Sequence, residues 1–303
     1  MYDIIIVGAG PAGLTAALYA RRAERSVLLI ERSTFGGQIT HSPRVENYPG
    51  FLEISGNELA EKLLDQVMTH GADIELSEVT GIRKRDGVFT VKTDSGEFTA
   101  RSVIIATGAK HRPLGIAREE EFVGEGISYC AVCDGAFYKD RTVAMIGGGN
   151  SALVEANLLA EGSKKVYIVQ NLGFLTGEAA LENKLRSRDN VEIILSSVVT
   201  EIVGDGELRG IKIMNTENGE ERTLEVDGVF VAIGQIPENE AFSDVIALDE
   251  RGYIISGEDC LPSSNEEGIF VAGDCRTKAI RQVATAAADG AVAALAACRY
   301  LDR

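Results

Sequence analysis

Two cysteines separated by two residues, in Cys130-Ala131-Val132-Cys133, could carry redox chemistry. Two thiols at this spacing can close a small disulfide ring, and the arrangement often lowers the pKa of one thiol. Asp134 follows directly, so a carboxyl could move a proton as thiol and thiolate interconvert. The segment therefore predicts a catalytic dithiol, Cys130 and Cys133, with Asp134 as its acid–base group.

The same spacing would also suit half of a zinc site or an inert pair in the core. A zinc site needs a second pair of ligands at similar spacing. The remaining cysteines and the histidines are isolated in the sequence: Cys260, Cys275, Cys298, His41, His70 and His111. We therefore predict no metal site and interpret each of these residues as a core or surface residue.

A glycine-rich segment, Gly8-Ala9-Gly10-Pro11-Ala12-Gly13, lies between a strand expected over 2–7 and a helix expected over 11–23. In such a G-x-G-x-x-G motif the glycines permit the tight turn, the approach of a pyrophosphate and close helix–strand packing. The phosphates then meet the helix N-terminus. Glu31 ends the next strand, where it could bind a ribose hydroxyl. We predict a dinucleotide here, FAD or NAD, against the alternative of a glycine-rich turn without ligand.

A second motif, G-x-G-x-x-A over residues 147–152, again lies between a strand and a helix. Its candidate nicotinamide-binding residues are Gly147, Gly149, Asn150 and Ala152. The strand after that helix ends at the neutral Gln170, so no acid there favours the free hydroxyl of NADH. The alternative is a turn that is kept only because the fold needs it.

Two βαβ units, over residues 2–31 and 142–169, position these motifs and indicate an internal duplication. Further expected elements are a hairpin over 88–99 turning near 94–96, strands over 102–107, 210–215, 228–233 and 268–273, and a closing helix over 283–300. The pattern predicts an α/β fold with two Rossmann-like three-layer domains.

Composition and charge restrict the partners. The 303 residues suffice for two domains, and 30 Lys and Arg against 46 Asp and Glu give a formal net charge of −16. This acidity disfavours nucleic acid and anionic membranes. No apolar run reaches the ~18 residues of a membrane span. Residues 1–20 lack a basic start and contain the glycine motif, which argues against a signal peptide. The cysteine usage favours a reducing cytoplasm.

Taken together, the motifs resemble those of bacterial low-molecular-weight thioredoxin reductases over nearly the whole chain. The matching segments are GAGPAG at 8–13, GGQ at 36–38, ENYPG at 46–50, ATG at 106–108, CAVCD at 130–134, GD at 273–274 and RQ at 281–282. The resemblance implies FAD as cofactor, a thioredoxin-like partner and a homodimer. We expect a split FAD domain, 1–113 and 242–303, around a pyridine-nucleotide-type domain, 114–241, that carries the dithiol.

By this resemblance, Cys133 faces the flavin and Cys130 attacks the partner's disulfide. Residues at matching positions are implied to bind FAD: Gly8, Gly10, Pro11, Ala12, Gly13, Glu31, Gly37, Gln38, Asn47, Thr107, Gly108, Gly273, Asp274, Arg281, Gln282 and Val283. The dithiol must meet the flavin in one state and a protein in another, so we expect the inner domain to swing about its two connections.

The chain departs from the family after the strand that ends at Val169. The family has H-R-R-x-x-x-R there, whose arginines bind the 2′-phosphate of NADPH, whereas this chain has QNLGFLT at 170–176. A phosphate is normally held by arginine forks. We therefore expect a donor other than NADPH: NADH, deazaflavin or reduced ferredoxin, which is acidic and could dock at Arg83, Lys84 and Arg85.

Three other functions are weighed against this interpretation. A flavin oxidase or ferredoxin–NADP-type reductase needs no CxxC pair. A peroxiredoxin-reductase subunit normally carries an additional N-terminal redox domain, whereas Met1 leads directly into the first strand. A non-enzymatic flavin-binding redox sensor would not turn over with any thioredoxin.

Overall fold

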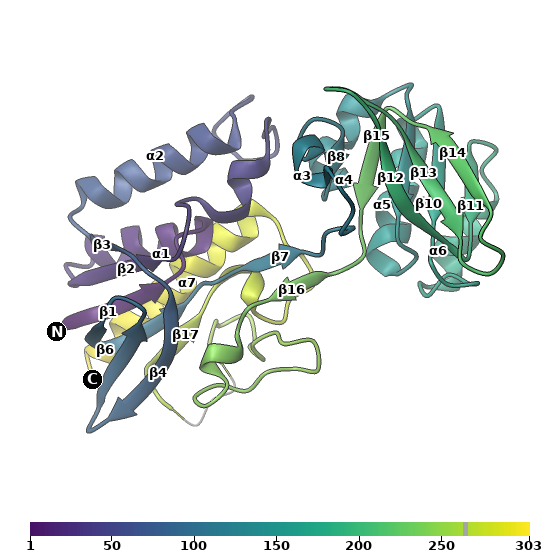
Figure 1. The fold of residues 1–303 in the computed structure, drawn as a ribbon. Helices are drawn as coiled ribbons and strands as arrows, with labels where there is room; N and C mark the ends of the chain where they lie inside the picture. Colours follow the sequence, from purple (N-terminus) through teal and green to yellow (C-terminus); the bar gives the residue numbers. More distant parts are fainter. Residues whose placement is uncertain (263–265) are drawn as a thin grey trace. The chain divides into compact units, whose positions relative to one another are not determined.

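The computed structural model describes residues 1–262 and 266–303. The chain divides into two compact units, one made of Met1–Lys110 and Ile236–Arg303 and the other of His111–Gln235. Figure 1 shows the second unit in teal and green. Where the chain passes between the units, β7 (Ala109–His111) and β16 (Gln235–Pro237) pair as a two-stranded sheet.

The first unit is built on a sheet in the order β3-β2-β1-β6-β5-β4, with β17 paired to β6. Its strands are β1 (Tyr2–Val7), β2 (Val27–Glu31), β3 (Asp73–Leu76), β4 (Val79–Arg85), β5 (Val88–Thr93), β6 (Glu97–Ile105) and β17 (Ile269–Val271). Alternate side chains of β1 pack on opposite faces of the sheet, as the two-residue period of a strand requires. Ile4 and Ile6 pack with the helices, whereas Ile5 and Val7 pack with Phe242.

The helices of this unit are α1 (Pro11–Arg22), α2 (Gly56–Thr69) and α7 (Val283–Leu301). Small residues let α1 and α7 approach closely. A Cβ on Gly290 would lie 2.1 Å from the carbonyl oxygen of Ala12, so only glycine fits at that crossing. Ser55 caps α2 by accepting the N–H of Glu58.

The second unit has a parallel sheet in the order β11-β10-β9-β15-β8. Its elements are the one-turn α3 (Glu119–Phe122), β8 (Ile127–Ser128), α4 (Ala131–Asp134), β9 (Thr142–Ile146), α5 (Asn150–Gly162), β10 (Lys165–Val169), α6 (Ala179–Arg186), β11 (Val191–Ile194) and β15 (Gly228–Val231). An antiparallel sheet of β12 (Ser197–Gly204), β13 (Leu208–Asn215) and β14 (Glu221–Glu225) packs on one face, and α5 packs on the other. The unit is therefore three-layered.

The predicted α/β class with Rossmann-like sheets is confirmed. Both βαβ units, the hairpin of β5 and β6, and the closing helix form where the sequence pattern places them. The expected strand over 268–273 is shorter, because Gly273 takes a φ of +81° and starts a 3-10 turn. The strand expected over 210–215 is β13 of the antiparallel sheet, whereas the pattern missed its neighbours β12 and β14 and the helices α2 and α6. No helix in the described parts of the chain is long and apolar enough to cross a membrane.

Candidate functional site

Each glycine of the first glycine-rich loop has a different structural role. Gly8 takes a φ of +100°, and a Cβ there would lie 2.4 Å from the carbonyl oxygen of Ala106. A Cβ on Gly13 would lie 1.8 Å from the carbonyl oxygen of Gly8. At Gly10, by contrast, a Cβ would meet nothing within 4 Å. Packing thus requires Gly8 and Gly13, whereas Gly10 borders open space before the N-terminus of α1, where a pyrophosphate fits.

Glu31 links this loop to the end of β2. One of its carboxylate oxygens accepts the N–H of Ala9 at 2.8 Å, and the other accepts the N–H groups of Arg32 and Ser33, both at 3.0 Å. The side chain is buried, so these bonds fix its position. Glu31 therefore orders the glycine loop itself, and its bond to a ribose stays a prediction.

The turn Gly273–Cys275 and the segment after it carry two buried polar atoms without a partner among the described residues. They are Oδ1 of Asp274 and Nε of Arg281. Burial raises the pKa of Asp274, and the charges of Lys278 and Arg281 oppose that shift. The Arg281 guanidinium lies over the ring of Tyr253, 4.4 Å from its centroid. Buried polar groups are nearly always hydrogen-bonded, so this unpaired acceptor and donor fit a polar ligand.

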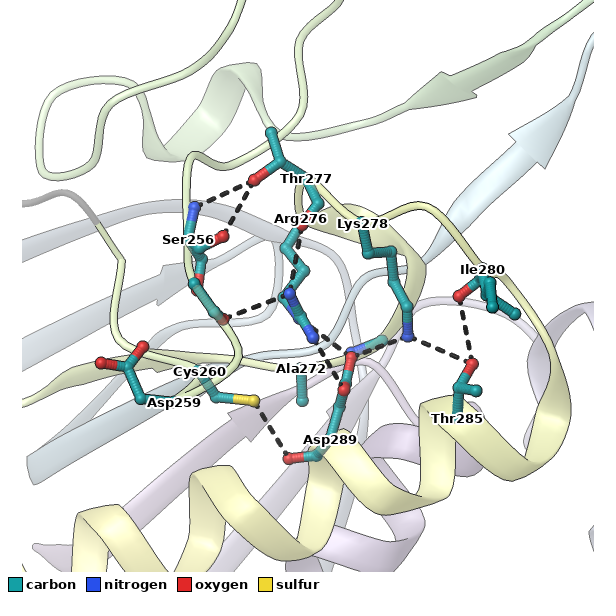
Figure 2. A network of polar contacts seen from close by, with 12 residues as sticks. Ser256, Asp259, Cys260, Ala272, Arg276, Thr277, Lys278, Ile280, Thr285 and Asp289 are labelled. Atoms are coloured by element: carbon teal, nitrogen blue, oxygen red, sulfur yellow. Dashed lines mark hydrogen bonds and ion pairs between the residues drawn. The ribbon is translucent and has the colours of Figure 1, made fainter. Parts of the chain in front are cut away.

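A charged network holds this turn against α7, as Figure 2 shows. Asp289 accepts four hydrogen bonds. They come from the N–H of Gly273 at 3.0 Å, from Nε and Nη2 of Arg276 at 2.9 Å each, and from Nζ of Lys278 at 2.9 Å. Arg276 is only 2% exposed. Burial alone would raise the pKa of Asp289, but the Arg276 guanidinium and the Lys278 ammonium outweigh it and hold that pKa below its usual value. Sequence reasoning did not find this network. The available signal was that Asp289 is the one acidic residue in the mostly apolar helix α7.

The other residues implied to bind FAD are spread over four segments of the first unit. Gly37 lies beside the glycine loop, where its Cβ would be 3.3 Å from Cα of Gly10. Asn47 donates to Oε1 of Gln282 at 3.3 Å, and Gln282 caps α7, which Val283 begins. Thr107 donates to Asn239 at 3.0 Å, Gly108 has open space at its Cβ, and Gln38 is exposed.

In the second unit, Cys130 and Cys133 form a disulfide with their Cα atoms 5.3 Å apart. Cys130 precedes the single turn α4, and its sulfur accepts the N–H of Cys133 at 3.2 Å. The Ser128 hydroxyl donates to Oδ2 of Asp134 at 2.6 Å and accepts the N–H of Cys130 at 3.1 Å. Oδ1 of Asp134 is buried without a partner among the described residues, and burial raises the pKa of this carboxyl. A carboxyl with a raised pKa therefore lies beside the disulfide.

A second carboxyl supports the same turn. Glu155 on α5 accepts the N–H of Ala131 at 2.9 Å, and burial raises the pKa of Glu155. Ala131 itself is 1% exposed. Sequence reasoning did not find Glu155, because its place on α5 gives no sign that it faces α4.

The glycine loop of the second unit is covered by the chain that follows β10. The Gly148 carbonyl accepts the N–H groups of Thr176 and Gly177 at 2.8 and 3.0 Å. Asn150 accepts the Glu178 N–H at 2.7 Å, and its amide donates to Oε1 of Glu178 at 3.3 Å. A carboxylate thus lies beside the first residue of α5, where dinucleotide phosphates would bind.

The turn in this second loop is itself well formed. Gly147 takes a φ of +126°, and its Cβ would lie 2.5 Å from the carbonyl oxygen of Ala232. A Cβ on Gly149 would have no neighbour nearer than 3.7 Å, and Ala152 is buried in the core. Gln170 is 5% exposed and donates to the Phe174 carbonyl at 3.4 Å. Gln170 is therefore a neutral side chain turned toward its own loop.

The isolated cysteines are buried thiols. Burial raises the pKa of Cys260 to about 12 and that of Cys275 to about 11, and Cys298 is also buried. The thiolate is the reactive form, so these residues are poor nucleophiles. Their interpretation as core residues is confirmed.

Comparisons with known families, proteins and structures agree on one family. Residues 2–290 match the family described as Pyridine nucleotide-disulphide oxidoreductase. The chain is 43% identical to the thioredoxin reductase of Listeria monocytogenes over 303 residues, which cover 100% of this chain and 94% of that protein. This chain belongs to the thioredoxin reductase family. It is an enzyme of the disulfide oxidoreductase class, and the family implies FAD as cofactor and thioredoxin as partner.

Solved structures of family members match the fold along the whole chain. Thioredoxin reductase from Streptococcus pyogenes superposes with a TM-score of 0.94 at 39% identity, covering 100% of this chain and 98% of that one. Thioredoxin reductase from Giardia duodenalis gives a TM-score of 0.92 at 34% identity, covering 100% of this chain and 99% of that one.

Proposed function

We propose that this enzyme passes an electron pair from a donor, by way of bound FAD, to Cys130 and Cys133 and then to the disulfide of a thioredoxin-like protein. The observation that carries the proposal is the Cys130–Cys133 disulfide with the half-buried carboxyl of Asp134 beside it. A paired redox disulfide argues against a flavin oxidase, which would need none.

The proposed FAD site lies in the first unit. Gly10 and the N-terminus of α1 would receive the pyrophosphate, while Asp274 and Arg281 would pair their open polar atoms with the cofactor. FAD would supply a carrier that accepts two electrons from the donor and releases them to a disulfide. Glu31 keeps the loop in shape by binding the N–H of Ala9.

The dithiol would do the chemistry on the partner. The Cys130 thiolate attacks one sulfur of the partner's disulfide, which forms a mixed disulfide and releases the partner's other thiolate. Cys133 then attacks Cys130, which closes the Cys130–Cys133 bond and frees the second partner thiolate. Asp134 would hold or give the protons, which its raised pKa favours.

The dithiol must meet FAD in one step and a protein in the next. We place the required movement at the two crossings between the units, near residues 110–111 and 235–236, where β7 pairs with β16. We assign FAD binding to the first unit, expect the enzyme to act in the cytoplasm, and expect a homodimer, which sedimentation of the purified protein would test.

We further propose that NADPH is not the physiological donor. Residues 170–176 contain no Lys or Arg, and the Glu178 carboxylate lies beside Asn150, where phosphates would bind. Each lost arginine–phosphate contact costs ~1.5–3 kcal/mol, so two or three lost contacts weaken binding by roughly 10²-fold or more. NADH, reduced ferredoxin and deazaflavin stay as candidates.

The basic residues expected to dock ferredoxin are not a bare positive patch. Arg83 pairs with Glu97 at 3.6 Å, Lys84 with Glu266 at 3.7 Å, and Arg85 with Asp86 at 3.6 Å. These acids offset the positive charge, so this surface gives little support to ferredoxin over NADH.

Anaerobic stopped-flow reduction of the flavin by each donor tests the proposal. We expect NADPH to reduce the flavin slowly and without saturation at micromolar concentrations. Rapid, saturable reduction by micromolar NADPH would refute it. A variant with Asn171→Arg, Leu172→Arg and Thr176→Arg restores arginines at three exposed positions and should gain NADPH-dependent reduction.

The dithiol assignment has a separate test. The purified protein should release FAD on denaturation, and Cys133→Ser should keep the flavin but lose disulfide reduction. Cys260→Ser changes a buried cysteine outside the pair and serves as the control. Full disulfide reductase activity in a variant lacking both Cys130 and Cys133 would show that the pair is structural.

A further inference from the structure

Glu155 is a half-buried carboxyl that the proposed reaction does not use. It reaches from α5 to the redox turn and accepts the N–H of Ala131 at 2.9 Å. The Ala131 nitrogen is bonded to the carbonyl carbon of Cys130, so the carboxyl lies within one residue of the first sulfur. A carboxyl bonded at this nitrogen can fix the shape of the turn, and its charge can act on the thiolate of the neighbouring Cys130.

The surroundings of Glu155 contain little that would cancel its charge. Asp134 lies on the same turn and accepts the Ser128 hydroxyl, and Tyr138 ends the adjoining 3-10 turn, Gly135–Tyr138. Burial and the charge of Asp134 raise the pKa of Tyr138 although the charge of Arg141 opposes that shift, so this phenol stays neutral. Neither Asp134 nor Glu155 has an ion-pair partner among the residues that the structure describes. No ion pair in the described parts of the chain therefore offsets the charge of either carboxyl at this turn.

Such a charge acts differently on the two redox states. The disulfide is neutral, whereas the reduced pair carries a thiolate when it reacts. A like charge nearby disfavours the ionised form of a group, typically by about tenfold or more. An ionised Glu155 therefore destabilises the reduced, thiolate form and leaves the disulfide almost unaffected. The pair becomes more reducing, which suits electron transfer to a partner disulfide.

We propose that Glu155 is a positioning residue that holds the Cys130–Cys133 turn through Ala131 and keeps the pair reducing through its negative charge. The proposal rests on the proposed role of Cys130 and Cys133 as the redox pair. It adds to that role a residue on a different element, α5, whose contact with α4 forms only in the folded unit.

The test is the equilibrium between the full-length enzyme and glutathione, measured at about pH 8, well above the usual pKa of a glutamate. Two thiols of the pair and one oxidised glutathione give the Cys130–Cys133 disulfide and two reduced glutathiones. The reaction is quenched in acid and the free thiols are alkylated. Mass spectrometry of the intact protein then gives the fraction of the pair that is oxidised. Glu155→Gln removes the charge, while its amide oxygen can still accept the Ala131 N–H.

We expect Glu155→Gln to shift this equilibrium toward the dithiol by about tenfold, which is ~30 mV for a two-electron couple. Glu155→Asp retains the charge and should stay within about twofold of the unaltered enzyme. Glu161→Gln changes an exposed acid on the same helix and should have no effect. An unchanged equilibrium in Glu155→Gln, or a shift toward the disulfide, would overturn the proposal.

The same measurement separates this inference from the proposed function. A pair in the unaltered enzyme that does not exchange with glutathione would refute the redox role of Cys130 and Cys133, and the role of Glu155 with it. If the pair exchanges with glutathione but Glu155→Gln leaves the equilibrium unchanged, only the role of Glu155 is refuted. A tenfold shift in Glu155→Gln, with no shift in Glu155→Asp or Glu161→Gln, supports the charge as the cause.

Discussion

Asp289→Asn should destabilise the first unit strongly, because Asp289 is the counter-charge of two buried cations. The carboxylate accepts four hydrogen bonds, from Gly273, twice from Arg276 and from Lys278, at 2.9–3.0 Å. The side chains of Arg276 and Lys278 are only 2% and 6% exposed. An asparagine has one acceptor oxygen, and its NH₂ group would face donors.

The expected loss follows from the uncompensated charge. Removing one partner of a buried ion pair costs ~3–5 kcal/mol, because the other charge stays buried. For a protein unit of this size, each kcal/mol lowers Tm by ~2–4 °C, so Asp289→Asn should lower Tm by roughly 6–20 °C. Lys278→Gln leaves the Arg276–Asp289 pair intact and should cost only about 1 kcal/mol.

Thermal unfolding of the apoprotein, followed by circular dichroism, measures both variants without a contribution from bound cofactor. Glu97→Gln is the matched control, because Glu97 and its partner Arg83 are 55% and 75% exposed and such pairs contribute ~0–1 kcal/mol. An Asp289→Asn protein that melts with the unaltered enzyme would refute the reasoning. So would a Lys278→Gln protein that loses as much stability as Asp289→Asn.

Three further predictions follow from the same structure. Gly10→Ala should fold normally but bind FAD at least tenfold more weakly in a titration of the apoprotein, because its Cβ occupies the open space before α1. Gly13→Ala should fail to fold, since its Cβ would lie 1.8 Å from the Gly8 carbonyl oxygen. Asp134→Asn should slow turnover by ~10²-fold in a thioredoxin reduction assay, with flavin content unchanged. The pKa of Asp289 is lower in the folded than in the unfolded chain. Its contribution to the free energy of unfolding is therefore present above the unfolded pKa of ~3.9 and is lost as pH falls through the folded value. Urea unfolding at decreasing pH should show a smaller loss of stability in Asp289→Asn than in the unaltered enzyme.

Local chemistry made part of the site predictable from the sequence. A tight turn between a strand and a helix requires glycine, so the pattern over residues 8–13 marks the first loop and the same pattern marks the second. The CxxC spacing already allows a disulfide, which Cys130 and Cys133 form. The apolar runs and their spacing were enough for the α/β class, because continuous apolar strands followed by helices bury both faces of a parallel sheet.

Only the tertiary structure decided which side chains support these motifs. Glu155 meets Ala131 across 24 residues of sequence, and Asp289 meets Gly273 across 16. Glu178 meets Asn150 across 28 residues and covers a loop that the motif alone presents as open. Each of these contacts depends on how one helix or segment packs against another. Packing depends on the whole core, so no local pattern of residue types specifies it.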